Sequence, residues 1–139
     1  MIALFADAGY WIALFHKADA LHARAVAVTA QFGRRPIVTT QMVLTEFLNW
    51  FAEAGQYRRS QAIRFIEALQ TRTSVRVIPQ TPDLFADAFS LYKQRPDKEW
   101  SLTDCASILI CQREGITEVL AHDRHFQQAG LTALLRDGA

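Results

Sequence analysis

The chain has 139 residues, of which 50% are hydrophobic and 21% charged, with a formal net charge of +1. This length supports a single domain, 1–139, with its own hydrophobic core, and the composition excludes a disordered protein. No apolar run approaches the ~18 residues that cross a bilayer, and the N-terminal segment lacks the basic start of a signal peptide, so we expect a cytoplasmic protein. The small net charge neither requires nor excludes a nucleic-acid partner.

Strand-like and helical segments alternate along the whole chain. The apolar periodicity predicts, in chain order, a strand at 2–6, a helix at 10–15 that continues to 19–31, a strand at 36–39, helices at 41–54 and 58–71, a strand at 74–78, helices at 82–92 and 102–114, a strand at 117–121, a short helix at 124–129 and a strand at 131–135. The strands are continuously apolar or β-branched, as in strands covered on both faces. We therefore expect an α/β fold, a three-layer α/β/α sandwich with a central, mainly parallel sheet.

Four acidic residues stand out against this pattern. Asp7 closes the first predicted strand, Glu46 interrupts an apolar helix, Asp104 opens another helix, and Asp123 follows the strand at 117–121. In an open α/β sheet these positions share the edge at the carboxyl ends of the strands, where ligands bind. Converging carboxylates repel one another and raise each other's pKa, and a hard cation such as Mg²⁺ or Mn²⁺ compensates them. The pattern therefore favours a metal site at this edge.

Each acid also has a purely structural explanation. Asp7 and Asp123 can cap the helices that follow them, and Ser101 with Asp104 has the spacing of a capping box. Glu46 can be a solvated helix residue, although apolar residues one turn away predict that its side of the helix is partly buried. Four separate caps remain an alternative, whereas one metal site explains all four acids by a single cause.

The segments that carry these acids resemble the PIN-domain family. They read Phe-Ala-Asp at 5–7, Thr-Glu-Phe at 45–47, Trp-Ser-Leu-Thr-Asp-Cys at 100–105 and Ala-His-Asp-Arg-His-Phe at 121–126. They occur in the family's order, and the resemblance spans essentially the whole chain. Ser-Leu-Thr-Asp-Cys and His-Asp-Arg-His-Phe are its more specific parts, because a lone aspartate after a strand is common.

The resemblance implies both an activity and partners. PIN domains are metal-dependent ribonucleases, and many small members are VapC-type toxins of toxin–antitoxin pairs. Asp7, Glu46, Asp104 and Asp123 would then be the catalytic residues that bind Mg²⁺ or Mn²⁺. They would hydrolyse phosphodiester bonds of single-stranded or structured RNA. The resemblance also implies an antitoxin protein as a partner and a homodimer, with which the many aromatic residues are compatible.

Further candidates surround the four acids. Ser101, Thr103 and Asn49 are candidates to orient the carboxylates, although capping or simple exposure explains them equally well. Arg124 and His125 are candidates to contact RNA, with a solvated helix start as the alternative. The chain departs from the family directly after the first acid, where Ala8-Gly9 replaces the Ser or Thr that many members carry. This departure bears on how Asp7 is oriented.

Two other functions compete with a nuclease. The first is a catalytically inert PIN-like module that binds RNA or protein; the presence of all four acids argues against it. The second is a phosphohydrolase of another α/β family. Many such enzymes need a second acid in an Asp-x-Asp pattern, and Asp7-Ala8-Gly9 lacks it.

Overall fold

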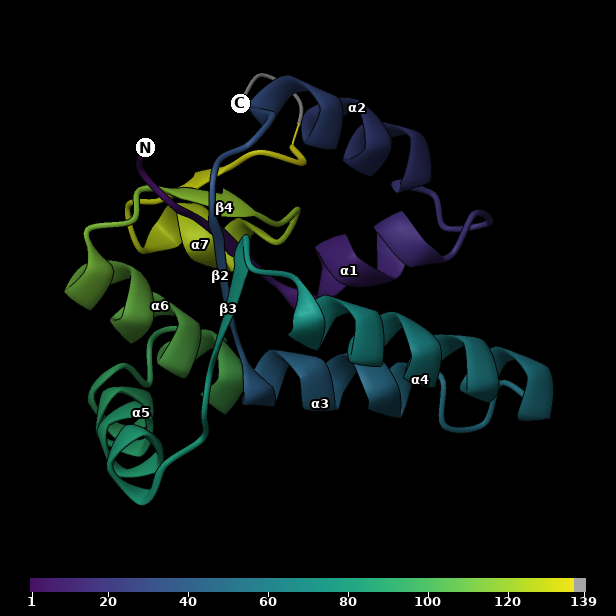
Figure 1. Cartoon of the computed structure of the whole chain (residues 1–139). Helices are drawn as coiled ribbons and strands as arrows, with labels where there is room; N and C mark the ends of the chain where they lie inside the picture. The colour runs from purple at the N-terminus through teal and green to yellow at the C-terminus, as the bar shows by residue number, and fades with distance from the viewer. Residues whose placement is uncertain (137–139) are drawn as a thin grey trace.

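The computed structural model describes residues 1–136 and is built around one five-stranded sheet (Figure 1). Its strands are β1 (Leu4–Ala6), β2 (Ile37–Thr40), β3 (Val75–Ile78), β4 (Glu118–Leu120) and β5 (Thr132–Ala133). They lie in the order β3-β2-β1-β4-β5, and every neighbouring pair is parallel. The predicted parallel sheet is confirmed.

The centre of the sheet determines where a ligand site can form. Strand β1 pairs with β2 on one side and with β4 on the other, so that Phe5 lies opposite both Val38 and Val119. The chain adds β2 and β3 to one side of β1 and then returns to add β4 and β5 to the other. The carboxyl ends of β1 and β4 therefore form the point where the winding direction changes, at which open α/β sheets bind ligands.

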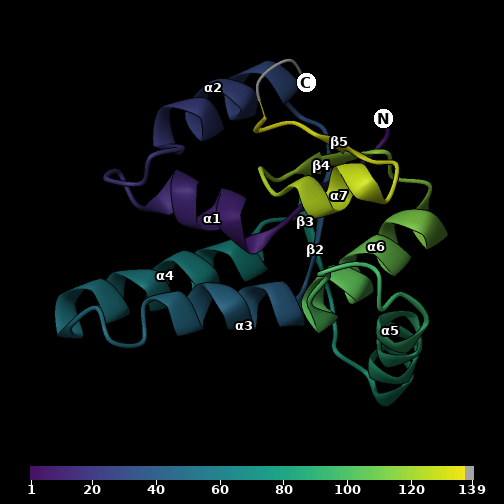
Figure 2. The same ribbon diagram turned by 180° about the vertical axis from the view of Figure 1, so that it is seen from behind.

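Seven helices flank the sheet in the described part of the chain. They are α1 (Ala8–Phe15), α2 (His22–Phe32), α3 (Gln41–Trp50), α4 (Gln56–Thr71), α5 (Pro82–Gln94), α6 (Leu102–Glu114) and α7 (Arg124–Gln128). Figures 1 and 2 show α1, α2 and α4 on one side of the sheet and α5 and α6 on the other. The three-layer α/β/α sandwich is thus confirmed. No helix within residues 1–136 is both long and apolar enough to cross a membrane.

The first predicted helix is interrupted rather than continuous. Helix α1 ends at Phe15, and His16 has an extended backbone. Asp19 accepts a hydrogen bond from the backbone N–H of Leu21, which closes a local turn of the kind that Asp favours. Nδ1 of His22 lies 2.7 Å from the carbonyl oxygen of Ala13, so the end of α1 finds a partner on α2. The side chains of this segment thus favour a turn over a continued helix.

An aromatic cluster fixes α3 against its neighbours. Phe47 on α3 stacks on Phe65 of α4 with ring centroids 5.3 Å apart, and Phe15 packs edge-on against both Phe47 and Phe51. Phe47 is fully buried. Because Phe47 anchors the helix, the direction of the adjacent Glu46 is set by core packing.

Candidate active site

Asp7 lies at the junction of β1 and α1, in the middle of the sheet. Its backbone N–H donates to the carbonyl oxygen of Leu120 at the end of β4, at 3.2 Å. Asp7 occupies the N-cap position of α1, but its side chain makes no capping hydrogen bond. The capping explanation therefore does not account for this carboxylate.

The surroundings of Asp7 resist its ionisation. Burial raises the pKa of Asp7 from 3.8 to about 7, and the negative charge of Asp104 adds to the rise. Glu46 and Asp123 raise the pKa further, whereas a hydrogen bond from the backbone of Ala8 lowers it. All three other acids thus act on Asp7 through space, although they come from three different helices or helix starts.

Glu46, on α3, lies near Asp7 and Asp104. The apolar residues around it predicted a partly buried side; Val43 is buried, whereas Glu46 itself and Trp50 are exposed. Desolvation nevertheless raises the pKa of Glu46, a hydrogen bond with Thr103 lowers it, and the charge of Asp104 raises it. These interactions join α3 to the start of α6.

Asp104 is held at the start of α6 by a complete capping box. Its N–H donates to Oγ of Ser101, and the N–H of Ser101 donates to Oδ2 of Asp104, both at 3.0 Å. The residue is only 8% exposed. The capping explanation is therefore correct for Asp104, and the same carboxylate also faces the other acids.

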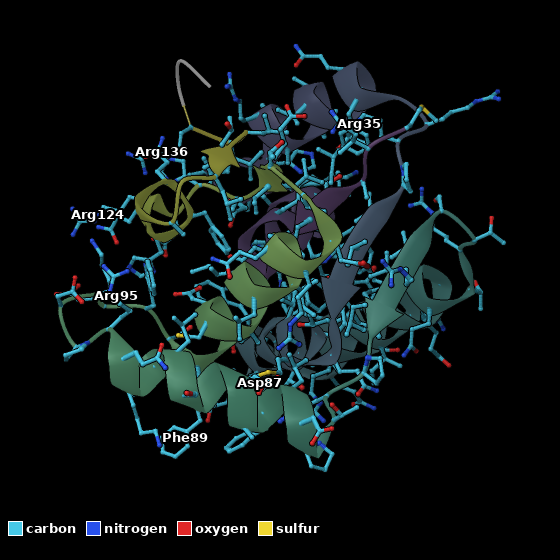
Figure 3. The ribbon with its side chains drawn as sticks, turned by 90° about the vertical axis from the view of Figure 1, so that its left-hand side faces the viewer. Arg35, Asp87, Phe89, Arg95, Arg124 and Arg136 are labelled. Carbon is cyan, nitrogen blue, oxygen red and sulfur yellow. The ribbon has the colours of Figure 1, made fainter. Side chains whose placement is uncertain are left out.

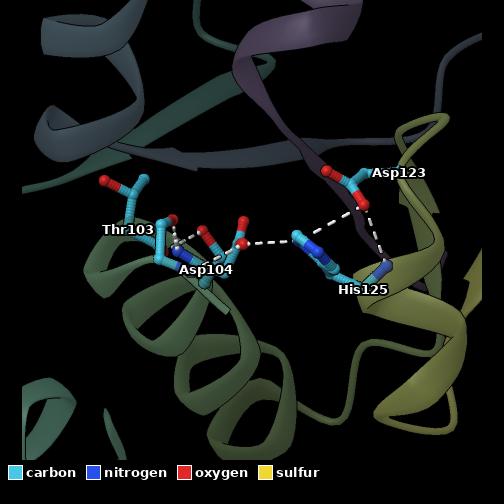
Figure 4. Close-up of polar contacts among 6 residues, drawn as sticks. Thr103, Asp104, Asp123 and His125 are labelled. Atoms are coloured by element: carbon cyan, nitrogen blue, oxygen red, sulfur yellow. Dashed lines mark hydrogen bonds and ion pairs between the residues drawn. The ribbon is translucent and has the colours of Figure 1, made fainter. Parts of the chain in front are cut away.

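His125 links Asp104 to Asp123 (Figure 4). Its Nδ1 lies 2.8 Å from Oδ2 of Asp104 and 3.2 Å from Oδ1 of Asp123. Since both carboxylates accept, Nδ1 carries the proton. Asp123 in turn caps α7, because its Oδ1 accepts from the N–H of His125 at 3.1 Å. One histidine therefore ties the starts of α6 and α7 together.

The four acids provide the donor chemistry that a hard cation prefers. Carboxylate oxygens are the usual ligands of Mg²⁺ and Mn²⁺, and the pKa of Asp7 is raised first by burial and then by the negative charges of the other three acids. The side chains are not drawn together on one point: within residues 1–136, no three His, Cys, Asp or Glu residues form a ready-made metal cluster. Oδ2 of Asp104 is engaged by Ser101 and His125 instead. The residues fit a divalent cation by chemistry.

Known structures share this architecture. No protein-family model matches the chain, and no curated protein matches it significantly in sequence. Among solved structures, it is similar to VapC20 of Mycobacterium tuberculosis, described as a toxin that cleaves the sarcin–ricin loop. The TM-score is 0.82 at 28% sequence identity, over 93% of this chain and 96% of that one. The chain has the fold of a VapC-type PIN domain.

A second structure supports the fold of this PIN domain alone. FitAcB from Neisseria gonorrhoeae superposes with a TM-score of 0.64 at 15% identity, over 94% of this chain and 95% of that one. At this identity the likeness is one of architecture. It agrees with the five-stranded parallel sheet described above.

The remaining predicted residues of the PIN domain fall into two groups. Ser101 and Thr103 contact the acids, through the capping box and through the hydrogen bond that lowers the pKa of Glu46. Asn49 and Arg124 are exposed, and Figure 3 shows Arg124 projecting outward from α7. Gly9, in the stretch where the family often has a hydroxyl, is exposed, with open space where a Cβ would lie.

Sequence reasoning assigned His125 to RNA and missed its contact with the acids. The only local signal was its position two residues after Asp123, at the start of a short helix. Its second partner, Asp104, is 21 residues away in the sequence. That pairing depends on α6 packing beside α7, which no short motif reports.

Proposed function

We propose that this PIN domain is a Mg²⁺- or Mn²⁺-dependent endoribonuclease. The observation that carries the proposal is the placement of Asp7, Glu46, Asp104 and Asp123 where β1 and β4 end, near enough that the charges of the other three add to the rise in the pKa of Asp7 that burial causes. Negative charge gathered at a ligand-binding edge of the sheet would bind a divalent cation. The likeness to VapC20, an RNA-cleaving toxin, supports RNA as the substrate.

The residues of the chain have distinct tasks in this proposal. Asp7, Glu46, Asp104 and Asp123 would hold the cation. A hard divalent cation supplies positive charge against the scissile phosphate and lowers the pKa of the attacking water. Ser101 and His125 keep Asp104 in one orientation, so that its carboxylate need not reorganise when substrate arrives.

The biological setting of the proposal is a toxin–antitoxin pair. The VapC-type fold and the RNA-cleaving toxin among its structural neighbours support a toxin role and an antitoxin protein as a partner. A homodimer in the cytoplasm is part of the same proposal. Coexpression with the product of a small reading frame directly upstream should relieve any growth arrest that the chain causes. Growth arrest that persists when the wild-type chain is coexpressed with this product would contradict the pairing.

Cleavage by acid variants tests the nuclease proposal. Asp7→Asn and Asp104→Asn keep the side-chain shape and remove the charge that holds the cation. Each should lower cleavage of single-stranded RNA and of a sarcin–ricin loop oligonucleotide at least about a hundredfold in magnesium. Glu67→Gln, which changes an exposed acid on α4, is the matched control and should cleave like the wild type.

Two results would contradict the nuclease. Full activity in both acid variants would show that the four carboxylates do not act in cleavage. A wild-type protein that binds RNA but leaves it intact with either metal would instead indicate the inert binding module.

A further inference from the structure

A hollow lies beside the four acids. A pocket of about 560 Å³ opens between α5 and the loop that leads into α6. Its walls are aromatic and mainly basic: Phe89, Tyr92 and Trp100 provide the rings, Lys93, Arg95 and Lys98 provide positive charges, and Glu99 provides one negative charge. Figure 3 shows Phe89 and Arg95 on this side of the molecule. Neither the acids nor the proposed cation explains these residues.

The pocket adjoins the acidic site directly. Ser101 and Cys105 belong to its lining, and they are respectively the capping partner and the next neighbour of Asp104. A ligand that filled the pocket would therefore extend toward the carboxylates. A polymer with one unit at the acids would place an adjacent unit here.

Two of the three aromatic rings are partly exposed to solvent. Phe89 and Tyr92, three residues apart on one face of α5, are 45% and 50% exposed. The ammonium group of Lys93 lies 4.8 Å from the centre of the Phe89 ring. Exposed rings bordered by cations are the elements that proteins use to stack the bases and hold the backbone of single-stranded nucleic acids.

Trp100 at the base of the pocket has an unmet hydrogen bond. The residue is 6% exposed, and its indole N–H has no acceptor among the described residues. The guanidinium of Arg95 covers the ring at 5.2 Å. A buried donor without a partner is unfavourable, and a ligand oxygen that reached the indole N–H would satisfy it.

The charges favour a polyanion over a second copy of the chain. Arg95 is paired with Asp97, but Lys93 and Lys98 form no ion pair within residues 1–136. In a twofold dimer the same patch meets itself, so this lining, which carries three positive side chains against the one negative charge of Glu99, would meet another positive surface. An RNA backbone presents phosphates to them instead.

We propose that this pocket is a nucleotide subsite for single-stranded RNA next to the scissile phosphate. One base stacks on Tyr92 and Phe89, and its phosphate lies against Lys98. The subsite rests on the proposed nuclease function, because RNA is the polymer that the acidic site would cut. In this proposal, the chain binds the RNA nucleotides that flank the scissile phosphate.

Binding without cleavage tests the subsite. A fluorescein-labelled, random-sequence RNA of twelve nucleotides is titrated with full-length protein in EDTA, and binding is followed by anisotropy while a gel checks that the RNA stays intact. Tyr92→Ala should weaken binding about tenfold, as loss of a stacking ring does, and Tyr92→Phe should restore it. Lys98→Ala should reduce the slope of log affinity against log salt by about 0.7, the value for one phosphate of a single strand.

Matched controls come from the far end of α4 and from the loop after α1. Tyr57→Ala removes a tyrosine that is 76% exposed, and Lys17→Ala removes an exposed lysine. Both should bind like the wild type. Circular dichroism confirms that each variant is folded.

Each outcome decides the subsite and the nuclease separately. Unchanged affinity in Tyr92→Ala and Lys98→Ala, or no binding by the wild type, overturns the subsite even if RNA is cut. Weaker binding in these variants with an uncut substrate in magnesium supports the subsite and removes the nuclease. A change of oligomeric state in Tyr92→Ala, with RNA binding intact, shows that the surface joins two copies and overturns the proposal.

Discussion

The two halves of the acidic site are built differently. On the α6–α7 side, Asp104 and Asp123 are both hydrogen-bonded, to Ser101 and His125 in the first case and to His125 in the second. On the β1–α3 side, Asp7 caps nothing, and desolvation and the other acids raise its pKa. Capping and site formation are therefore compatible, because a cap holds a carboxylate in place. The uncapped half carries the electrostatic cost that a cation would relieve.

The largest expected effect is on the stability of Asp7→Asn. A folded-state pKa of about 7 against an ordinary 3.8 means that folded protein binds more protons between these values. The contribution of Asp7 to the free energy of unfolding is therefore most favourable below about pH 4, and it is lost as the pH rises through 7. At pH 8 in EDTA, removal of the charge should raise the free energy of unfolding by about 2–4 kcal/mol, or roughly 10 °C in Tm.

The pH series provides the control for this prediction. At pH 5 the folded state keeps the proton on Asp7 but the unfolded state has lost it, so the difference in Tm between the two proteins should shrink from pH 8 to pH 5 and close only near pH 4. Thermal unfolding in EDTA from pH 5 to 8 measures the difference directly. A wild type whose stability rises between pH 5 and 8 relative to Asp7→Asn would show that Asp7 is not an uncompensated acid.

Asp104→Asn should behave in the opposite way. The substitution weakens charge-assisted hydrogen bonds to the Ser101 N–H and to His125. We expect the free energy of unfolding to fall by about 1.5 kcal/mol at pH 8, against the gain for Asp7→Asn. Urea unfolding of both variants in EDTA measures the contrast. If both variants gain stability equally, repulsion between carboxylates outweighs hydrogen bonding in both halves of the acidic site. The proposed difference between the halves would then be wrong.

The sequence predicted the parallel sheet well, for a physical reason. Strands covered on both faces are continuously apolar, and the residue that ends such a strand is easily seen, as with Asp7 after 2–6. The capping box of Ser101 and Asp104 is equally local. Contacts between distant segments were not visible: the link from His125 to Asp104 depends on how α6 and α7 pack.

The surface was the least predictable part of the chain. The periodic stripe from Pro82 onward correctly predicted a helix, and Leu84 and Ala88 are buried. Phe89 and Tyr92 belong to the same stripe but remain exposed beside a pocket. Hydrophobic periodicity identifies an apolar face without showing whether the protein itself covers all of it.

A divalent cation should stabilise the wild type chiefly through the uncapped half. At about ten times its Kd, Mg²⁺ or Mn²⁺ should add ~1.4 kcal/mol, or roughly 4 °C in Tm. Since the cation must displace a proton from Asp7 below its pKa of about 7, affinity should fall up to about tenfold from pH 7 to pH 6. Melting curves against metal concentration at both pH values test this. No shift with either ion at about 10 mM would argue against a useful cation site.

The smallest expected effect tests whether His125 stabilises the capped half through Asp104. His125→Ala should lower the free energy of unfolding by about 1 kcal/mol, because Nδ1 loses both carboxylate partners. His122→Ala is the matched control, since His122 is exposed on the same segment. A double-mutant cycle with Asp104→Asn isolates the contact: the loss from His125→Ala should shrink in that background. Additive losses would mean that His125 stabilises the fold independently of Asp104. The contact between His125 and Asp104 would then contribute no stability of its own.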